Sequence, residues 1–298
     1  MSAFNRAFES NPQDARILFE RDQLWKRIGI SPRQRLSELQ SHAHLLQRRD
    51  DLVVELATLH NQLGKPQEAL ALLTSRRFQP WEGGEGLALA QYLRAHLALG
   101  RVALATGDFV EAQRSFLAAL DIPENLGEAR HLLANQAEVY FWLGTAFAET
   151  DRPQAMIWWE RAAGQQGDFQ QMSVHSISAA TFWSAQALKH LGRQPEAEAL
   201  LEAILAYSRK LAQEEPVIDY FATSLPAMLL FEEDLCKRYH INALFLAAQA
   251  SYGLAAGRES RAKTADLLRQ ILAEDINHMD ASLLLRNLES DSVEGRKE

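Results

Sequence analysis

A short turn recurs along the sequence and divides it into pairs of helical stretches. In each copy a glycine ends one stretch, and an alanine follows five residues later in the next. Glycine adopts the left-handed backbone conformation that ends a helix at no steric cost. Asp151 and Ala155 form a version one residue shorter. The four full copies are Gly64 with Ala69, Gly107 with Ala112, Gly192 with Ala197, and Gly257 with Ala262.

Small and large residues accompany each turn at fixed distances, which predicts that the two helices pack closely as an antiparallel hairpin. Prolines near the start of the second helix suit this arrangement, because the first turn of a helix needs no N–H donor there. The large residues, four after each alanine, are Leu73, Phe116, Trp159 and Leu201. The small residues, seven before each turn, are Ala57, Gly100, Gly144, Ala185 and Ala250. The prolines are Pro66, Pro153 and Pro195.

The composition agrees with an all-α fold. Alanine and leucine together make up 90 of the 298 residues, whereas valine and isoleucine make up 19. Residues with unbranched Cβ atoms lose little side-chain freedom in a helix, so this ratio favours helices over strands. The chain is long enough to hold a core without disulfides.

Charge and cysteine content exclude several functional classes. The net charge of −8 is opposite to the basic surface expected of a nucleic-acid-binding protein. No apolar run approaches the roughly 20 residues of a membrane span. Cys236 is the only cysteine, which predicts a reducing, cytoplasmic environment. We therefore expect no nucleic acid, membrane or cofactor among the partners.

The spacing of the turns is irregular. The turn positions 29, 64, 107, 151 and 192 lie 35 to 44 residues apart, and the last interval, to 257, is 65 residues. The longer intervals require longer helices or inserted loops. We expect an irregular inserted helical segment near 213–240, one repeat domain over 1–289, and a disordered polar tail over 290–298.

These hairpins resemble the tetratricopeptide repeat, a helix–turn–helix unit of about 34 residues. Leu63–Leu70, Thr106–Ala112 and the aromatic-rich Tyr140–Gly144 carry the resemblance. It implies an all-α, tetratricopeptide-like α–α superhelix, or solenoid, of about six helix pairs. Phe8–Pro12 is similar to the end of a second helix, so we expect the chain to begin inside a repeat and to be a piece of a longer protein.

A narrower resemblance is to the C-terminal repeat region of a group of large bacterial proteins. Those proteins carry, ahead of the repeats, a β-sandwich domain similar to galactose mutarotase. The resemblance implies a carbohydrate-related setting for the parent protein and no reaction for this chain. Its residues are Phe78–Gly86, Ile122–Glu128, Asp219–Leu235, Arg48–Leu52 and Trp159–Ala163.

The concave groove of such a superhelix is the main candidate binding site. Stacked first helices present their inner faces to the groove, which is how solenoids bind protein partners. The alternative is that these residues pack against the parent's own β domain. Apolar residues such as Val54 and Leu97 argue against the Lys/Asn clamp that holds a chaperone's C-terminal carboxylate. Counting back from each turn, the groove candidates are Arg16, Phe19, Gln23, Lys26, Arg27, Arg94, Arg101, Glu138, Phe141, Phe182, Gln186 and Lys189.

A second candidate site is the glycine-rich loop around Trp81. An aromatic face beside carboxylates is typical of sugar binding; the alternative is that the glycines turn the chain and Trp81 packs against a neighbouring repeat. The segment Gly83–Gly86 lacks the context of a phosphate-binding loop. The candidate sugar or interdomain contacts are Trp81, Glu82, Glu85, Glu124, Asn125, Glu128, Asp219 and Tyr220.

The sequence predicts neither a catalytic nor a metal site. Cys236 and His240 lie one helical turn apart without a third ligand, and His42 and His44 point to different sides of a helix. Carboxylates at helix starts, such as Glu124 and Glu128, are common without catalysis. We therefore predict a non-catalytic scaffold for protein–protein or interdomain contacts. The alternative is a carbohydrate-binding or carbohydrate-processing accessory module that acts with a β-sandwich domain.

Overall fold

The fold is a superhelix of helix hairpins. The computed structural model describes residues 2–81, 83–170, 173–215, 234–254 and 258–294. In these ranges six hairpins follow one another: α2–α3, α5–α6, α7–α8, α9–α10, α11–α12 and α14–α15. The first eight helices are α1 (Ser2–Ser10), α2 (Ala15–Arg27), α3 (Pro32–Ser41), α4 (Ala43–Leu46), α5 (Asp50–Gln62), α6 (Pro66–Thr74), α7 (Leu87–Ala105) and α8 (Phe109–Ala118). The later helices are α9 (Ala137–Phe147), α10 (Arg152–Ala163), α11 (Thr181–His190), α12 (Gln194–Leu211), α14 (Leu235–Leu254), α15 (Arg258–Glu274) and α16 (Met279–Glu294).

The predicted turns have the expected backbone. Gly29, Gly64, Gly107 and Gly192 have φ between 74° and 80°, the left-handed conformation that ends the first helix of a hairpin. Aspartates then begin some of the helices: the side chain of Asp108 accepts a hydrogen bond from the N–H of Glu111 at the start of α8. The helix–turn–helix prediction is confirmed at these positions.

Glycine and large aromatic residues set the distance between the helices of two hairpins. A Cβ atom on Gly100 would lie 2.3 Å from Phe116, and one on Gly144 would lie 2.3 Å from Trp159. Both aromatic rings are buried in this space. Ala112 and Ala155, five and four residues after the turn, are fully buried as well. The small-to-large pairing predicted from the sequence is therefore present in α7–α8 and α9–α10.

The last hairpin departs from the predicted register. Ala262 is exposed on α15, and the buried positions of this helix are Thr264, Ala265, Leu268 and Ile271. The prediction that Ala262 packs against the preceding helix is therefore wrong. The turn at Gly257 lies outside the described residues.

The regions expected to be irregular are only partly described. Most of 213–240 lies outside the described residues, and α14 starts at Leu235 as a regular helix of 20 residues. At the C-terminus, α16 continues to Glu294, past the expected start of the tail at Ser290, and 295–298 lie outside the description. The domain boundary at 289 stays a prediction.

The long connections between hairpins are ordered against one another. The Nδ2 atom of Asn125, in the 3-10 helix η1 (Glu124–Leu126), donates to the carbonyls of Leu73 and Arg76, at 2.8 Å each. A later connection forms the antiparallel strands β1 (Asp168–Gln170) and β2 (Ser173–His175). These insertions, together with the long helices α7 and α12, account for the wide spacing of the turns.

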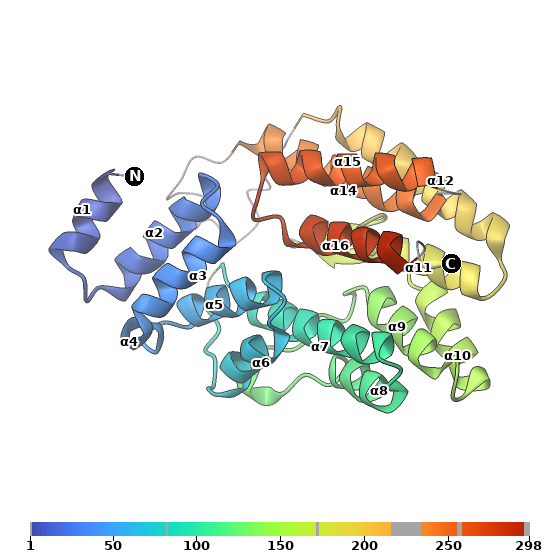
Figure 1. Ribbon diagram of the computed structural model, residues 1–298, viewed down its shortest axis with the longest axis horizontal. Coiled ribbons are helices and arrows are strands. Elements are labelled where there is room, and N and C mark those ends of the chain that lie inside the picture. The colour runs from blue at the N-terminus through green and yellow to red at the C-terminus, as the bar shows by residue number, and fades with distance from the viewer. Residues whose placement is uncertain (1, 82, 171–172, 216–233, 255–257, 295–298) are drawn as a thin grey trace.

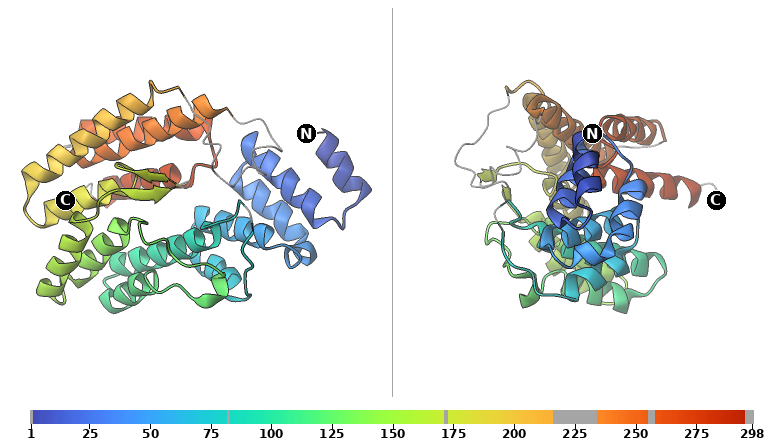
Figure 2. Two further views of the ribbon diagram at one scale, coloured as in Figure 1. Left: turned by 180° about the vertical axis from the view of Figure 1, so that it is seen from behind. Right: turned by 90° about the vertical axis from the view of Figure 1, so that its left-hand side faces the viewer.

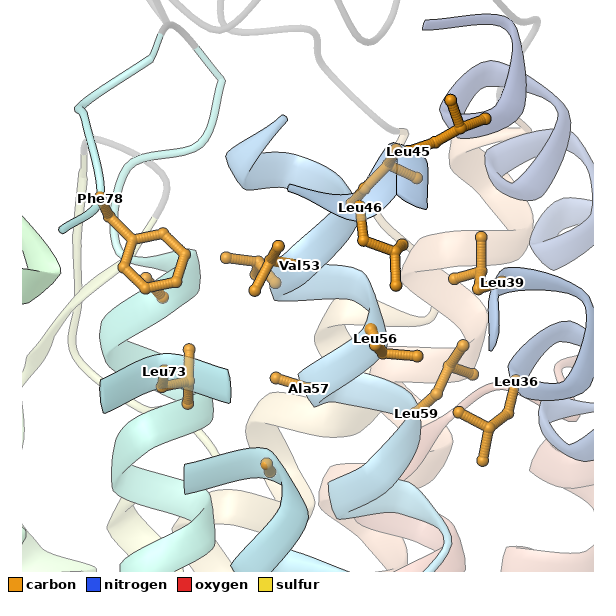
Figure 3. Packing of buried hydrophobic residues seen from close by; sticks show 14 of the residues in the cluster. Leu36, Leu39, Leu45, Leu46, Val53, Leu56, Ala57, Leu59, Leu73 and Phe78 are labelled. Carbon is orange, nitrogen blue, oxygen red and sulfur yellow. The ribbon is translucent and has the colours of Figure 1, made fainter. Parts of the chain in front are cut away.

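The chain turns back on itself. The first helices α5, α7 and α9 form one row, and α12, α14 and α15 return alongside it (Figure 1). In this view α16 lies between the two rows, and the end-on view shows that it projects to one side of them (Figure 2). The view from behind shows the same curvature (Figure 2). Each hairpin buries apolar side chains against its neighbours: Leu56 and Leu59 of α5 face α3 (Figure 3). Within the described ranges, every helix is too short or too polar to span a lipid bilayer.

Substituting Ala112 by tryptophan tests the hairpin packing. We expect Ala112→Trp to lower the free energy of unfolding by about 1–3 kcal/mol, because a large side chain must enter a filled core. Ala262→Trp is the matched control: this side chain points to solvent, so we expect a change within about 0.5 kcal/mol. Urea unfolding followed by circular dichroism measures both. Equal losses in the two variants would contradict the register described above.

Candidate functional site

Charged side chains from α7 and α9 face the last helix, α16. The Nη2 atom of Arg94 donates to both carboxylate oxygens of Asp280, at 2.9 and 3.1 Å. The guanidinium of Arg101 lies 5.0 Å from the ring centroid of Trp142, within the range of a cation–π contact. Glu138, one turn before Trp142 on α9, interacts electrostatically with Arg101, Asp280 and Arg94. We call Arg94, Arg101, Glu138 and Asp280 the charged cluster.

The environment of Glu138 favours its neutral form. Burial raises the pKa of Glu138 to about 7; Arg101 opposes this rise, and the negative charge of Asp280 adds to it. Desolvation penalises the charged carboxylate more than the neutral acid. Glu138 therefore exchanges a proton near neutral pH, and the net charge of the cluster changes with it.

A second group of charges is buried beside the first helices. The guanidinium of Arg35 donates to Asp22 through Nε (3.0 Å) and Nη2 (2.6 Å), and Nη2 also lies 2.5 Å from Glu55. The Nζ atom of Lys26 lies 3.2 Å from Glu55. Although burial opposes ionisation, Lys26 and Arg35 lower the pKa of Glu55 to about 2. Two cations and two anions thus balance, which a buried charge group requires.

The C-terminal segment reaches this buried group. The Nη1 atom of Arg35 donates to the side-chain oxygen of Asn277, at 3.0 Å. The amide nitrogen of Asn277 donates to the carbonyls of Lys26 and Ile30, at 3.0 and 3.2 Å. The side-chain oxygen and amide nitrogen of Asn277 are therefore both satisfied by residues near the other end of the chain.

Five of the predicted groove residues fall into two sets. Arg94, Arg101 and Glu138 come together in the charged cluster. Phe141 and Phe182 are buried in apolar clusters, where they pack against neighbouring hairpins and present little surface to a groove. Of these five residues, the three charged ones are therefore those that come together.

Four of the remaining groove candidates have contacts within the chain, and two have buried side-chain nitrogens without a hydrogen-bond partner. Lys189 donates a hydrogen bond to the carbonyl of Gly253, and Arg16 pairs with Glu20 along α2. Arg27 donates to the carbonyl of Gln23 at 3.4 Å, and Phe19 lies beneath the guanidinium of Arg49. The side-chain nitrogens of Gln23 and Gln186 are buried without a hydrogen-bond partner.

Part of the predicted sugar-contact set gathers around a small hollow. Trp81, Glu85 and Glu128 line a space of about 100 Å³, and the indole of Trp81 lies against Gly84. Both carboxylate oxygens of Glu128 accept backbone N–H groups at the start of α7, from Gly86 (2.6 Å) and Leu89 (3.1 Å). Glu128 thus stabilises the N-terminus of a helix. Asn125 holds the loops together as described above, and Glu124 is exposed on η1. Glu82, Asp219 and Tyr220 lie outside the described residues.

No group of three or more His, Cys, Asp or Glu side chains with the geometry of a metal site occurs in the described part of the chain. Cys236 is exposed near the start of α14, and His240 lies 3.6 Å from Glu274 of α15.

Several residues of this region were missed by the sequence reasoning. Arg35, Asn277 and Asp280 take part in contacts between segments that are far apart in the chain: Arg35 and Asn277 are separated by 242 positions. Nothing in a periodic pattern pairs residues over that distance, so no sequence signal pointed to them.

Comparison with known proteins identifies two of the hairpins. A tetratricopeptide repeat family model matches residues 93–117 and 178–203. The first match covers most of α7 and nearly all of α8, and the second covers α11 and the first half of α12. Among solved structures, the chain is similar to the crystal structure of the P58(IPK) TPR domain, with 14% identity, 98% of this chain and 85% of that chain covered, and a TM-score of 0.29. The family-model matches thus identify tetratricopeptide repeats at these two hairpins, and the structure itself shows the all-α arrangement of stacked hairpins around them.

Glu138 makes the stability of the protein depend on pH. Its pKa is raised from 4.5 to about 7 on folding, so its contribution to the free energy of unfolding falls as the pH rises between these values. We expect Glu138→Gln to remove this fall, so that the variant gains about 1–3 kcal/mol relative to the wild type between pH 4.5 and pH 8. Urea unfolding across this pH range measures the difference. The exposed Glu149→Gln is the control, and the same gain in that variant would assign the effect to net charge.

Proposed function

We propose that the chain is a non-catalytic scaffold of helical repeats that binds a protein or peptide along its concave side. The observation that carries this proposal is the charged cluster, where Arg94 and Arg101 of α7 and Glu138 of α9 face the inside of the superhelix. Charged side chains on adjacent first helices suit recognition of a partner with complementary charges. Tetratricopeptide repeats are generally scaffolds for protein–protein interactions, which supports the same assignment.

The proposal extends to the setting of the protein. The partner is either a separate protein or peptide, or a β-sandwich domain of the same parent protein. The narrower sequence resemblance to bacterial proteins with a domain similar to galactose mutarotase supports the second option and a carbohydrate-related context. The single cysteine, Cys236, supports a cytoplasmic location.

Peptide selection tests the concave side as the binding surface. We expect a random peptide display library, panned against the full chain, to yield peptides whose affinity falls about tenfold or more in Arg101→Glu, because a charge at the interface is reversed. Arg209→Glu is the matched control, since Arg209 is exposed on α12, the second helix of its hairpin. Fluorescence anisotropy with the selected peptides measures both affinities. Peptides that lose affinity equally in both variants, or in neither, would place the binding surface elsewhere.

A carbohydrate accessory role is the second candidate function. The grouping of Trp81 with Glu85 and Glu128 favours it, since an aromatic ring beside carboxylates suits a sugar. The hollow of about 100 Å³ is smaller than the roughly 300 Å³ at which ligand pockets begin. Glu128 is also occupied by backbone N–H groups. A sugar would therefore contact only the rim formed by Trp81 and Glu85.

Calorimetry with neutral mono- and oligosaccharides tests this candidate. If the role is correct, the full chain gives binding heat that disappears in Trp81→Ala, because the ring that stacks on the sugar is lost. Circular dichroism verifies that the variant is folded. Trp25→Ala, on α2, is the control and retains the heat. A panel without any heat, or heat that persists in Trp81→Ala, would contradict the role.

A further inference from the structure

The two ends of the superhelix meet along a contact that is entirely different from the contacts between neighbouring hairpins. We call it the seam: residues 276–286 on one side, and α2, α3, α5 and α7 on the other. Besides the bonds of Asn277 and the pair of Arg94 and Asp280, two further hydrogen bonds between described residues cross it. Gln62 donates to the carbonyl of Ile276 at 3.4 Å, and Arg286 donates to the carbonyl of Gln62 at 2.8 Å.

Among the described residues, the buried apolar clusters next to the seam lie on one side of it or the other. The buried apolar cluster that includes Ala281 and Leu288 of α16 otherwise contains residues of α14 and α15. The cluster around α3 and α5 contains no residue of α16. At the seam itself, Ile276 is 40% exposed, whereas Met279 in the first turn of α16 is buried. The clustered apolar residues of α16 therefore pack in the C-terminal hairpin, and the contacts described above that join this segment to the N-terminal repeats are polar.

Apolar packing and polar contacts differ in the free energy that their separation requires. Separating apolar surfaces costs roughly 25 cal/mol per Å² of area exposed to water. Hydrogen bonds and exposed ion pairs are replaced by bonds to water at a small net cost. Arg94 and Asp280 are 33% and 42% exposed, so water already reaches them. When Asn277 leaves, Arg35 keeps both Asp22 and Glu55, so no buried charge loses its counter-charge.

We propose that the superhelix opens at the seam as a latch while the helices on both sides stay folded. Opening separates α16 from Arg94, Arg101 and Glu138 and exposes the charged cluster to solvent. The relevance of that exposure to a partner rests on the proposed function, whereas the opening itself follows from the polar character of the seam alone.

Distances across the seam test the latch. Ile28 and Ile276 are exposed on opposite sides of it, and Asn277 bonds the carbonyls on both sides of Ile28. We would attach spin labels to Ile28→Cys and Ile276→Cys in a full chain that carries Cys236→Ser, and measure the distance by pulsed electron paramagnetic resonance. Labels on Val102→Cys and Val110→Cys, which are exposed within the hairpin α7–α8, form the control pair.

At low salt we expect most molecules to show one short distance. As the salt concentration rises, the fraction of molecules with a second, longer distance should grow, because salt weakens the pair of Arg94 and Asp280. Asp280→Arg places two cations together and should raise the population ratio of long to short distances about tenfold. The charge-swapped variant with Arg94→Asp and Asp280→Arg should restore the short distance. The control pair should keep one distance throughout.

Two results would overturn the latch. A single unchanged distance in Asp280→Arg and at all salt concentrations would mean that the seam does not open. If the population with the long distance grows only together with a loss of the helical circular dichroism signal, the opening is unfolding. Neither result depends on peptide binding, so the latch and the proposed function fail independently.

Discussion

The close approach of a large ring to a glycine is the contact on which the rest of this fold depends. Phe116 against Gly100 and Trp159 against Gly144 leave no room for a Cβ atom on either glycine. Each pair fixes the distance between the two helices of a hairpin. Successive hairpins of this kind then stack side by side. The curvature that brings α7 and α9 to face α16 follows from this stacking, as does the position of the charged cluster.

The sequence predicted the hairpins well at positions where the residue type is strongly associated with one backbone conformation. Glycine is the residue that most easily adopts the positive φ of a helix-ending turn, and Gly107 and Gly192 have it. Alanine is less specific, because it is accepted on both buried and exposed helix faces. Among the 45 alanines of this chain, Ala262 fits the pattern and yet points to solvent. The strands β1 and β2, three residues each, are too short for any alternation to show in a sequence.

Helical periodicity grouped some residues of the candidate site but could not predict how deeply each of them is buried. Counting helical turns placed Arg94, Arg101 and Glu138 on the inner face, and the structure groups them. The same counting placed Phe141 and Phe182 there, although both are buried between hairpins. Periodicity says which way a side chain points, but how much of it a neighbour covers depends on the distance between helices. Contacts such as Arg94 with Asp280, 186 positions apart, depend on the curvature of the whole superhelix.

When a repeat superhelix closes on itself, its last helix needs apolar packing for stability, but apolar packing against the first repeats would cover the concave face. The polar seam meets both requirements. Stability in such arrays comes mainly from neighbouring units, so the last helix needs an apolar partner on one side only. A large apolar contact between the other side of this helix and the first repeats would keep the concave face permanently buried. Here α16 directs Ala281 and Leu288 toward α14 and α15 and directs Asp280 and Arg286 toward the first repeats. The balanced set of Lys26, Arg35, Asp22 and Glu55 stays paired within the N-terminal repeats. The C-terminal segment thus adds bonds to this set without being needed to neutralise it.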